Sequence, residues 1–162
     1  MVVFKKIDEN NFEECMNLSV FEEQKLFVAQ NKLSLAQAYL ALTNNYCKPM
    51  PYAIYDEDRM IGFIMMAYHT KPEVKDEEDL FDEAIYEIWR LMIDKNDQGK
   101  GYGRKALEKA IEFIKTYPCG DAKKIVLSYE PENIGAKHLY ESCGFVSTGD
   151  EFEGEIVSVF EL

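Results

Sequence analysis

A glycine-rich segment in the middle of the chain has the composition of an anion-binding loop. It lies between a predicted strand and a predicted helix and reads Gln98-Gly99-Lys100-Gly101-Tyr102-Gly103-Arg104-Lys105. Glycines let the backbone turn sharply and bring bare N–H groups against a ligand. The first turn of the following helix adds unsatisfied donors and a partial positive charge. The segment therefore predicts a pyrophosphate site, where Lys100, Arg104 and Lys105 can screen further phosphate charge.

Two better-known phosphate loops do not match this segment. A Walker loop needs G-x-x-x-x-G-K followed by Ser or Thr, which is missing here. A dinucleotide fingerprint needs G-x-G-x-x-G near the start of a βαβ unit, whereas these glycines alternate in mid-chain. A merely flexible connection is the alternative, but the glycines open a strongly amphipathic helix, with its apolar stripe at Ala106, Leu107, Ala110, Ile111 and Ile114.

The pattern of apolar residues predicts the elements that position this loop. Strands are predicted at 2–7, 52–55, 60–68, 84–93, 124–129, from 146 onward, and at 156–160. Helices are predicted at 11–18, at 22–28, after an N-cap at Ser34, from about Gly103, and at 133–143 before Gly144. Pro49 and Pro51 are predicted to end the early helical region.

The order of these elements predicts an α/β fold. Hairpin signals indicate antiparallel strand pairs, and the strand–helix–strand unit at 84–129 indicates one central parallel pair. We therefore expect a mixed, mostly antiparallel sheet flanked by helices. The length of 162 residues fits one domain, residues 1–162.

Bulk composition excludes several classes of function. No stretch approaches the ~20 apolar residues that span a bilayer, and the N-terminus lacks a secretory pattern, so we expect a cytoplasmic protein without membrane contact. The four cysteines form no zinc or disulfide pattern, and no metal is predicted. The net charge of -12 argues against a nucleic-acid ligand and suits a small cationic substrate, although acidity also serves solubility alone.

Two motifs resemble the signatures of the GNAT superfamily of N-acetyltransferases. Gln98, Gly101 and Gly103 are similar to its acetyl-CoA signature, Q/R-x-x-G-x-G/A. The segment 133–145 reads Asn-Ile-Gly-Ala-Lys-His-Leu-Tyr-Glu-Ser-Cys-Gly-Phe and resembles its helix, N-x-x-A-x-x-L-Y-x-x-x-G-F. The resemblance implies the GNAT fold over the whole chain, with acetyl-CoA as cosubstrate.

Further segments resemble bacterial spermine/spermidine acetyltransferases. They are Phe27-Val28-Ala29-Gln30-Asn31, Ser34-Leu35-Ala36-Gln37-Ala38-Tyr39, Trp89-Arg90-Leu91-Met92-Ile93-Asp94 and Leu127-Ser128-Tyr129-Glu130-Pro131-Glu132-Asn133. This resemblance implies acetylation of a polyamine, with direct attack of a primary amine on the thioester. Membership in such a subgroup does not by itself fix the natural acceptor.

The resemblance also implies roles for single residues. Residues 98–104 would hold the pyrophosphate. Tyr140 would be the general acid for the departing thiolate, because a phenol of pKa about 10 keeps its proton at neutral pH; a packing role is the alternative. Asn133 would order the pantetheine or cap its helix. The backbone at Met92 and Ile93, in a strand parted from its neighbour by a bulge, would face the thioester and pair with the pantetheine.

The general base is the least defined part of the predicted site. Glu87 lies eleven residues before Gln98, where histone-type relatives carry their glutamate base. It would act directly or through water, or else bind the amine or lie on the surface. Eukaryotic-type polyamine acetylases carry an acidic pair where this chain has Trp89 and Arg90. Strand alternation predicts Glu87, Trp89 and Leu91 on one face.

Other candidates and functions stay open at this point. Glu22, Glu23 and the acidic segment 73–83 are candidates for holding a second ammonium group. Trp89 is expected in the core, and His69 and His138 are expected to be non-catalytic.

Acetylation of a protein N-terminus, a lysine or an aminoglycoside is the alternative function within the enzyme class. A non-catalytic CoA-binding module is the alternative outside it. A homodimer through the last strands is common in such folds.

Overall fold

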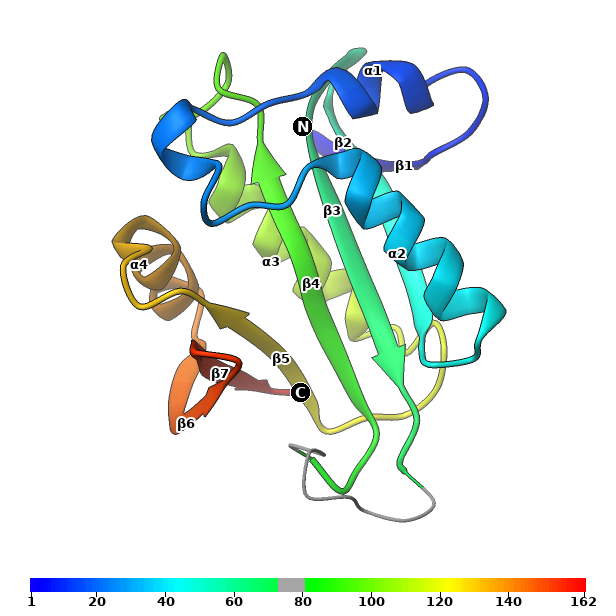
Figure 1. Cartoon of the computed structure of the whole chain (residues 1–162), viewed down its shortest axis with the longest axis vertical. Helices are drawn as coiled ribbons and strands as arrows, with labels where there is room; N and C mark the ends of the chain where they lie inside the picture. The colour runs from blue at the N-terminus through cyan, green and yellow to red at the C-terminus, as the bar shows by residue number, and fades with distance from the viewer. Residues whose placement is uncertain (73–80) are drawn as a thin grey trace.

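The fold is built on a single twisted sheet (Figure 1). The structure is a computed structural model that describes residues 1–72 and 81–162. Its sheet has the strand order β1-β2-β3-β4-β5-β7-β6. The strands are β1 (Val2–Lys6), β2 (Lys48–Asp56), β3 (Arg59–His69), β4 (Ile85–Ile93), β5 (Lys124–Tyr129), β6 (Val146–Phe152) and β7 (Glu155–Glu161). Neighbours are antiparallel except β4 and β5, which confirms the mixed sheet with one parallel pair.

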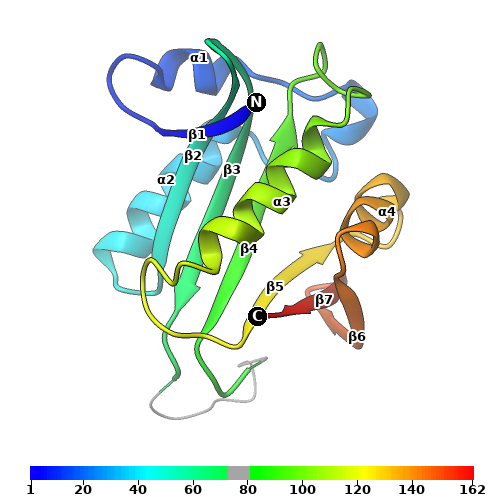
Figure 2. The same ribbon diagram turned by 180° about the vertical axis from the view of Figure 1, so that it is seen from behind.

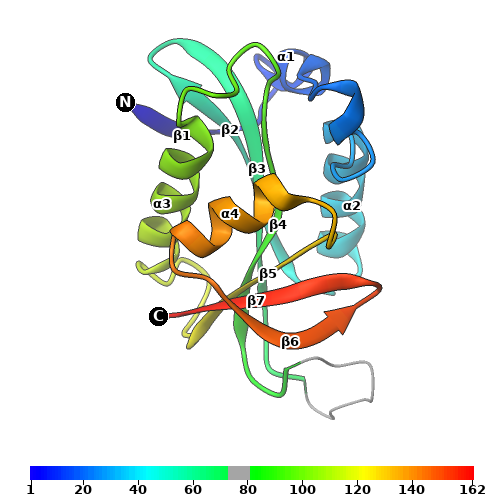
Figure 3. The same cartoon turned by 90° about the vertical axis from the view of Figure 1, so that its left-hand side faces the viewer.

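Helices cover both faces of this sheet (Figures 2 and 3). They are α1 (Phe12–Asn17), α2 (Asn31–Thr43), α3 (Tyr102–Ile114) and α4 (Ile134–Ser142), with a short 3-10 helix η1 (Glu22–Gln24). Residues of α3 and α4 pack in one apolar core, and residues of α1 and α2 pack in a second core on the opposite face. The predicted stripe of α3 is buried at all five positions, so the amphipathic pattern is confirmed.

The two parallel strands part soon after they meet. They pair only at Tyr86 with Ile125 and at Glu87 with Val126. β4 then continues to Ile93 and β5 to Tyr129, without a further pair between them in the described residues. The edge of β4 that follows Glu87 is consequently free of β5, which opens the sheet between its two halves.

The helix predicted at 22–28 is wrong. Only Glu22–Gln24 form a helical turn, of the 3-10 type, and turns follow it. The side-chain oxygen of Gln24 accepts the backbone N–H of Phe21 (3.1 Å), and Leu26 is 85% exposed. Polar side-chain bonds hold the start of this segment, while Val28 at its end packs against the second core.

The boundaries predicted around α2 are also wrong. The helix begins at Asn31 after an N-cap at Gln30, and Ser34 is buried inside it. The amide of Asn31 donates to the Cys15 carbonyl (2.8 Å), so these polar residues bind backbone oxygens in the interior. Pro49 and Pro51 lie within β2, at positions where β1 does not pair with it. A proline lacks the N–H that a partner would need, so that free edge tolerates both.

Candidate active site

A cavity of about 960 Å³ lies where β4 and β5 part. Its walls come from β4, the loop 97–104, the end of β5, α4, the segment 24–29 and the hairpin between β6 and β7. The predicted residues that it brings together are Glu87, Met92, Ile93, Gln98, Gly99, Gly101, Tyr102, Gly103, Arg104, Asn133 and Tyr140. Two motifs that are distant in the sequence thus share one cavity.

The glycine-rich loop owes its shape to left-handed backbone. Gly99 and Gly101 have φ values of +75° and +77°, which L side chains rarely adopt. Gly101 is the N-cap of α3, and a Cβ built on it meets no atom within 4 Å. The first turn of α3 therefore presents its free N–H groups to the cavity without a side chain in between. Such a helix start fits a phosphate group.

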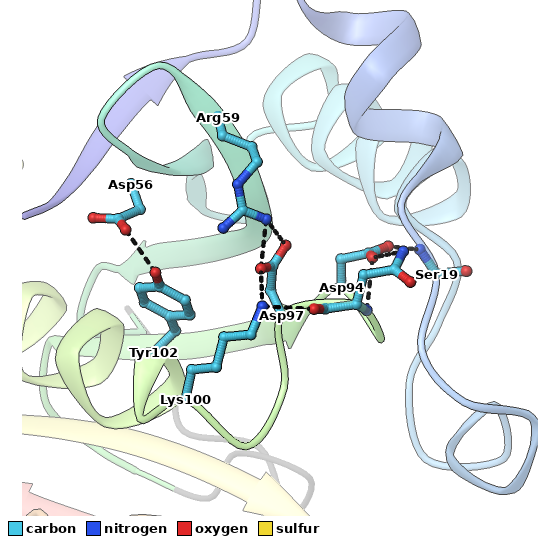
Figure 4. A network of polar contacts seen from close by, with 8 residues as sticks. Ser19, Asp56, Arg59, Asp94, Asp97, Lys100 and Tyr102 are labelled. Carbon is cyan, nitrogen blue, oxygen red and sulfur yellow. Dashed lines mark hydrogen bonds and ion pairs between the residues drawn. The ribbon is translucent and has the colours of Figure 1, made fainter.

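Lys100 does not line this cavity, unlike its neighbours in the loop. Its Nζ donates to the Asn96 carbonyl (2.8 Å) and to Oδ1 of Asp97 (2.9 Å). The guanidinium of Arg59 also binds both oxygens of Asp97, as Figure 4 shows. Arg59, and after it Lys100, hold the pKa of the buried Asp97 carboxyl below its ordinary value. Lys100 is thus a part of the support of the loop.

Further hydrogen bonds fix the loop to the rest of the fold. The side-chain amides of Gln98 and Gln24 bind each other reciprocally (2.8 and 3.0 Å), and Gln98 Nε2 also donates to the Ile93 carbonyl (3.0 Å). The Tyr102 hydroxyl donates to Asp56 (2.6 Å), and Asp94 accepts the backbone N–H of Ser19 (2.9 Å; Figure 4). Gln98, at the start of the loop, therefore joins the end of β4 to the segment around η1.

A bulge in β4 changes which side chains share a face. Arg90 pairs with Met65 and Ile88 with Met66, so Trp89 has no partner on β3. Trp89 packs against the second core, whereas Leu91 packs against the first. The prediction that Glu87, Trp89 and Leu91 lie on one face is wrong, because an extra residue reverses the alternation after it. Trp89 both packs on the core and lines the cavity.

Met92 and Ile93 lie at the free part of the β4 edge. Met92 belongs to the second core and Ile93 to the first, so the side chains are used for packing. Both residues line the cavity, and neither has a partner on β5 in the described structure. Apart from the Ile93 carbonyl, which Gln98 binds, the main chain on this edge is therefore available to an extended ligand between the two strands.

Tyr140 lies on α4 with its ring packed between two aromatic residues. Its centroid is 5.6 Å from that of Tyr129 and 6.2 Å from that of Phe145. Burial raises the pKa of Tyr140 to about 12, with smaller contributions from Glu155 and Tyr129. The hydroxyl therefore keeps its proton at neutral pH. Across residues 1–72 and 81–162 it makes no hydrogen bond to another protein group.

Asn133 caps the helix that carries Tyr140. Its Oδ1 accepts the backbone N–H of Ala136 (3.2 Å), so the predicted cap is confirmed. The same residue lines the cavity. Because the capping oxygen is fixed by the helix, the position of Asn133 in the wall is fixed as well.

Glu87 lies on β4 where the parallel pair ends. Its Oε2 is 2.8 Å from Nε2 of His69, at the end of β3. Glu87 borders the large cavity and also a smaller cavity of about 380 Å³ on its other side. Glu87 and Tyr140 thus line one cavity, the first from β4 and the second from α4.

Two charged residues of this cavity were missed by the sequence analysis. Glu155, the first residue of β7, accepts a hydrogen bond from the Ser128 hydroxyl. Arg90 donates to the Trp89 carbonyl (2.7 Å) and to Gln37 (3.2 Å), while its buried Nε has no partner in the described residues. Burial lowers the pKa of this guanidinium. Only the strand register places these residues here, so no local motif could have revealed them.

In residues 1–72 and 81–162, no group of three or more His, Cys, Asp or Glu side chains could hold a metal ion. No helix of the described chain is long and apolar enough to cross a membrane.

Comparison with known proteins identifies the family to which the chain belongs. The family model of the acetyltransferase (GNAT) family matches residues 13–145. The chain belongs to the GNAT acetyltransferase family. This GNAT acetyltransferase is therefore an acetyl-CoA-dependent N-acetyltransferase, which confirms the cosubstrate and the enzyme class expected from the two motifs.

Relatives and solved structures agree with this placement. The GNAT acetyltransferase is 33% identical over 162 residues to a spermine/spermidine N(1)-acetyltransferase of Bacillus subtilis (strain 168), which covers 98% of this chain and 97% of the relative. The probable spermine N(1)-acetyltransferase of B. subtilis subsp. natto (strain BEST195) gives the same identity and coverage. A solved aminoglycoside acetyltransferase with coenzyme A has a TM-score of 0.74 at 19% identity, covering 99% of this chain and 95% of that one. Spermidine N-acetyltransferase from Vibrio cholerae, with CoA and spermine, has a TM-score of 0.65 at 18% identity, with 99% and 94% covered.

Proposed function

We propose that this GNAT acetyltransferase transfers the acetyl group of acetyl-CoA to a primary amine of a polyamine such as spermine or spermidine. The observation that carries the proposal is the single cavity that joins the glycine-rich loop to Glu87 and Tyr140. The acceptor class is supported by the two full-length relatives named for spermine and spermidine. The net charge of -12 suits a cationic substrate.

The residues of the cavity fit acetyl-CoA, which supplies an activated acetyl thioester. The N–H groups at the start of α3, next to Gly101, would hold the pyrophosphate, with Arg104 beside them. The free edge of β4 at Met92 and Ile93 would pair with the pantetheine and polarise the thioester carbonyl. Asn133 would order the same arm from the start of α4.

Proton transfers are assigned to two residues. An amine must be neutral to attack, so Glu87 would accept its proton, directly or through a water. The amine nitrogen then forms a bond to the acetyl carbon and loses its second proton to water, and the carbon–sulfur bond breaks. Tyr140 would give its proton to the departing sulfur, because its raised pKa keeps the phenol protonated up to alkaline pH.

The cysteines of the chain support direct attack over an acetyl-cysteine route. Among the described residues that line the cavity there is no cysteine. Burial raises the pKa of both Cys15 and Cys47 to about 11, so neither is a ready thiolate at neutral pH. An amine that attacks the thioester itself needs no such nucleophile.

The acceptor class is tested by an acetylation screen with acetyl-CoA. The panel contains spermine, spermidine, simple monoamines, an aminoglycoside and a peptide with a free N-terminus, with thiol release as the readout. We expect the largest kcat/KM with a polyamine. Background turnover of both polyamines beside rapid acetylation of the peptide or the aminoglycoside would contradict the proposed acceptor while leaving the family unchanged.

A further inference from the structure

A second cavity adjoins the proposed active site at Glu87. Its volume is about 380 Å³, and it lies where β3 ends, β4 begins and the β6–β7 hairpin turns. Glu87, Ser128 and Phe152 line both cavities. The two cavities therefore meet at these three residues.

The walls of this second cavity have the chemistry of an alkylammonium site. Three aromatic rings border it, from Tyr46, Phe81 and Phe152, and two carboxylates, from Glu83 and Glu87. Aromatic faces and carboxylates attract an ammonium group, while the rings also pack against its methylene chain. No lysine or arginine of residues 1–72 and 81–162 is part of this lining.

Two lysines outside the lining of the second cavity contact Glu83. Lys124 Nζ lies 2.9 Å from Oε1 of Glu83, and Lys123 Nζ lies 3.6 Å from Oε2. Lys124 also lies over the Phe81 ring, 5.7 Å from its centroid. These contacts hold the pKa of the Glu83 carboxyl below its ordinary value, so it is ionised at neutral pH. They also compensate a part of its charge.

The first cavity contains the opposite charge next to Glu87. Arg90 lines it, with its guanidinium 5.7 Å from the centroid of the Trp89 ring. A second ammonium group beside Arg90 would be repelled. The first cavity also contains carboxylates, among them Glu153 and Glu155, whereas the described lining of the second has carboxylates and no lysine or arginine. The second cavity is therefore the more favourable one for a further positive charge.

From this juxtaposition we propose that the second cavity binds a second ammonium group of the acceptor while its terminal amine lies at Glu87. The inference rests on the proposed function and adds to it a determinant of acceptor choice. Glu83 and Phe81 belong to this subsite and have no part in the acetyl transfer. They favour a polyamine over an alkyl monoamine, which has no second ammonium group.

The test compares spermidine with n-butylamine in steady-state kinetics of the full chain. Glu83→Gln and Phe81→Leu should each raise the KM for spermidine by roughly two- to fivefold, the scale of one exposed cation–aromatic or ion-pair contact. The KM for n-butylamine and both kcat values should stay within about twofold, since n-butylamine has no second charge. Lys124→Gln should act in the opposite direction and lower the KM for spermidine, because it frees the Glu83 carboxylate.

A matched control and two adverse outcomes complete the test. Glu112→Gln makes the same change of charge on the exposed side of α3 and should leave both KM values unchanged. Equal shifts for spermidine and n-butylamine, or none in any variant, would overturn the subsite while the polyamine activity stands. Absence of polyamine turnover in the unaltered protein would instead overturn the proposed function, and the subsite with it.

Discussion

At the scale of single residues, Tyr140 is the group on which the chemistry depends most. Tyr140→Phe removes one oxygen and keeps the ring that packs on Tyr129 and Phe145. If the hydroxyl protonates the departing thiolate, kcat should fall by about 10²–10⁴-fold, while acetyl-CoA binding changes little. Full activity of the variant would show that the sulfur leaves without this acid, and lost binding with normal kcat would make Tyr140 a cosubstrate contact alone.

The raised pKa of Tyr140 also predicts the alkaline side of the rate profile. A phenol with a pKa of about 12 stays protonated well above neutral pH. The kcat should therefore show no loss from ionisation of this acid up to about pH 10, the pKa of an unperturbed tyrosine. A decline of kcat centred near pH 9 to 10 in the unaltered protein, absent from Tyr140→Phe, would contradict this assignment.

Glu87 should matter most where the acceptor amine is protonated. Glu87→Gln keeps the size of the side chain and its capacity to bind His69 but cannot accept a proton. We expect kcat/KM to fall by on the order of 10²-fold near pH 7 and by much less near pH 10, where more of the amine is already neutral. An unchanged pH–rate profile would return Glu87 to a structural or binding role.

At the scale of elements, the start of α3 should bind the pyrophosphate through its backbone. Gly101→Asp has room for its side chain but brings a negative charge to the N-cap, so CoA affinity should fall by roughly tenfold or more. Gly101→Asn has the same shape without the charge and should bind better than the Asp variant. Gly149→Asp, at a similar φ of +86° away from the cavity, should bind CoA normally. Normal CoA binding by Gly101→Asp would contradict the phosphate assignment.

The support of this loop should make stability depend on pH through Asp97. Its carboxyl has a lowered pKa because Arg59 and Lys100 bind it, so its contribution is present above the pKa of about 3.9 of an unfolded Asp. This contribution is lost as pH falls through the lower pKa of the folded state. Asp97→Asn should lower Tm by several degrees at pH 7, and the gap to the unaltered protein should close in acid. Asp58→Asn, at the exposed residue that precedes Arg59 in the sequence, should show neither effect. A difference in Tm between Asp97→Asn and the unaltered protein that persists unchanged at pH 2 would contradict the assignment.

The two motifs could be predicted from the sequence because each is local. The loop needs only the alternating glycines before an amphipathic helix, and the capped helix with Tyr140 needs only residues 133–145. The resemblance implied a bulge in this strand, but its position at Trp89 could not be predicted, since it depends on the register of β4 against β3. It places Arg90 in the cavity and moves Leu91 to the other face.

At the scale of the whole molecule, the element order was sufficient for the fold class. The parallel pair, the antiparallel remainder and the presence of flanking helices follow from hairpin signals and one strand–helix–strand unit. Glu155 and the second cavity were beyond this reasoning. Both require β7 to lie between β5 and β6, so that the last strand of the chain pairs with β5. The expected homodimer stays a prediction, as do the roles of the site residues.

The central claim is that the cavity passes an acetyl group directly from acetyl-CoA to a polyamine. The most direct measurement follows the acetyl group by mass spectrometry in a single turnover, with protein in excess over acetyl-CoA. We predict that acetyl-CoA alone leaves the protein mass unchanged, and that added spermidine yields monoacetylspermidine and free CoA in equal amounts. An acetylated protein that precedes the product, or consumption of acetyl-CoA without an acetylated polyamine, would contradict the account.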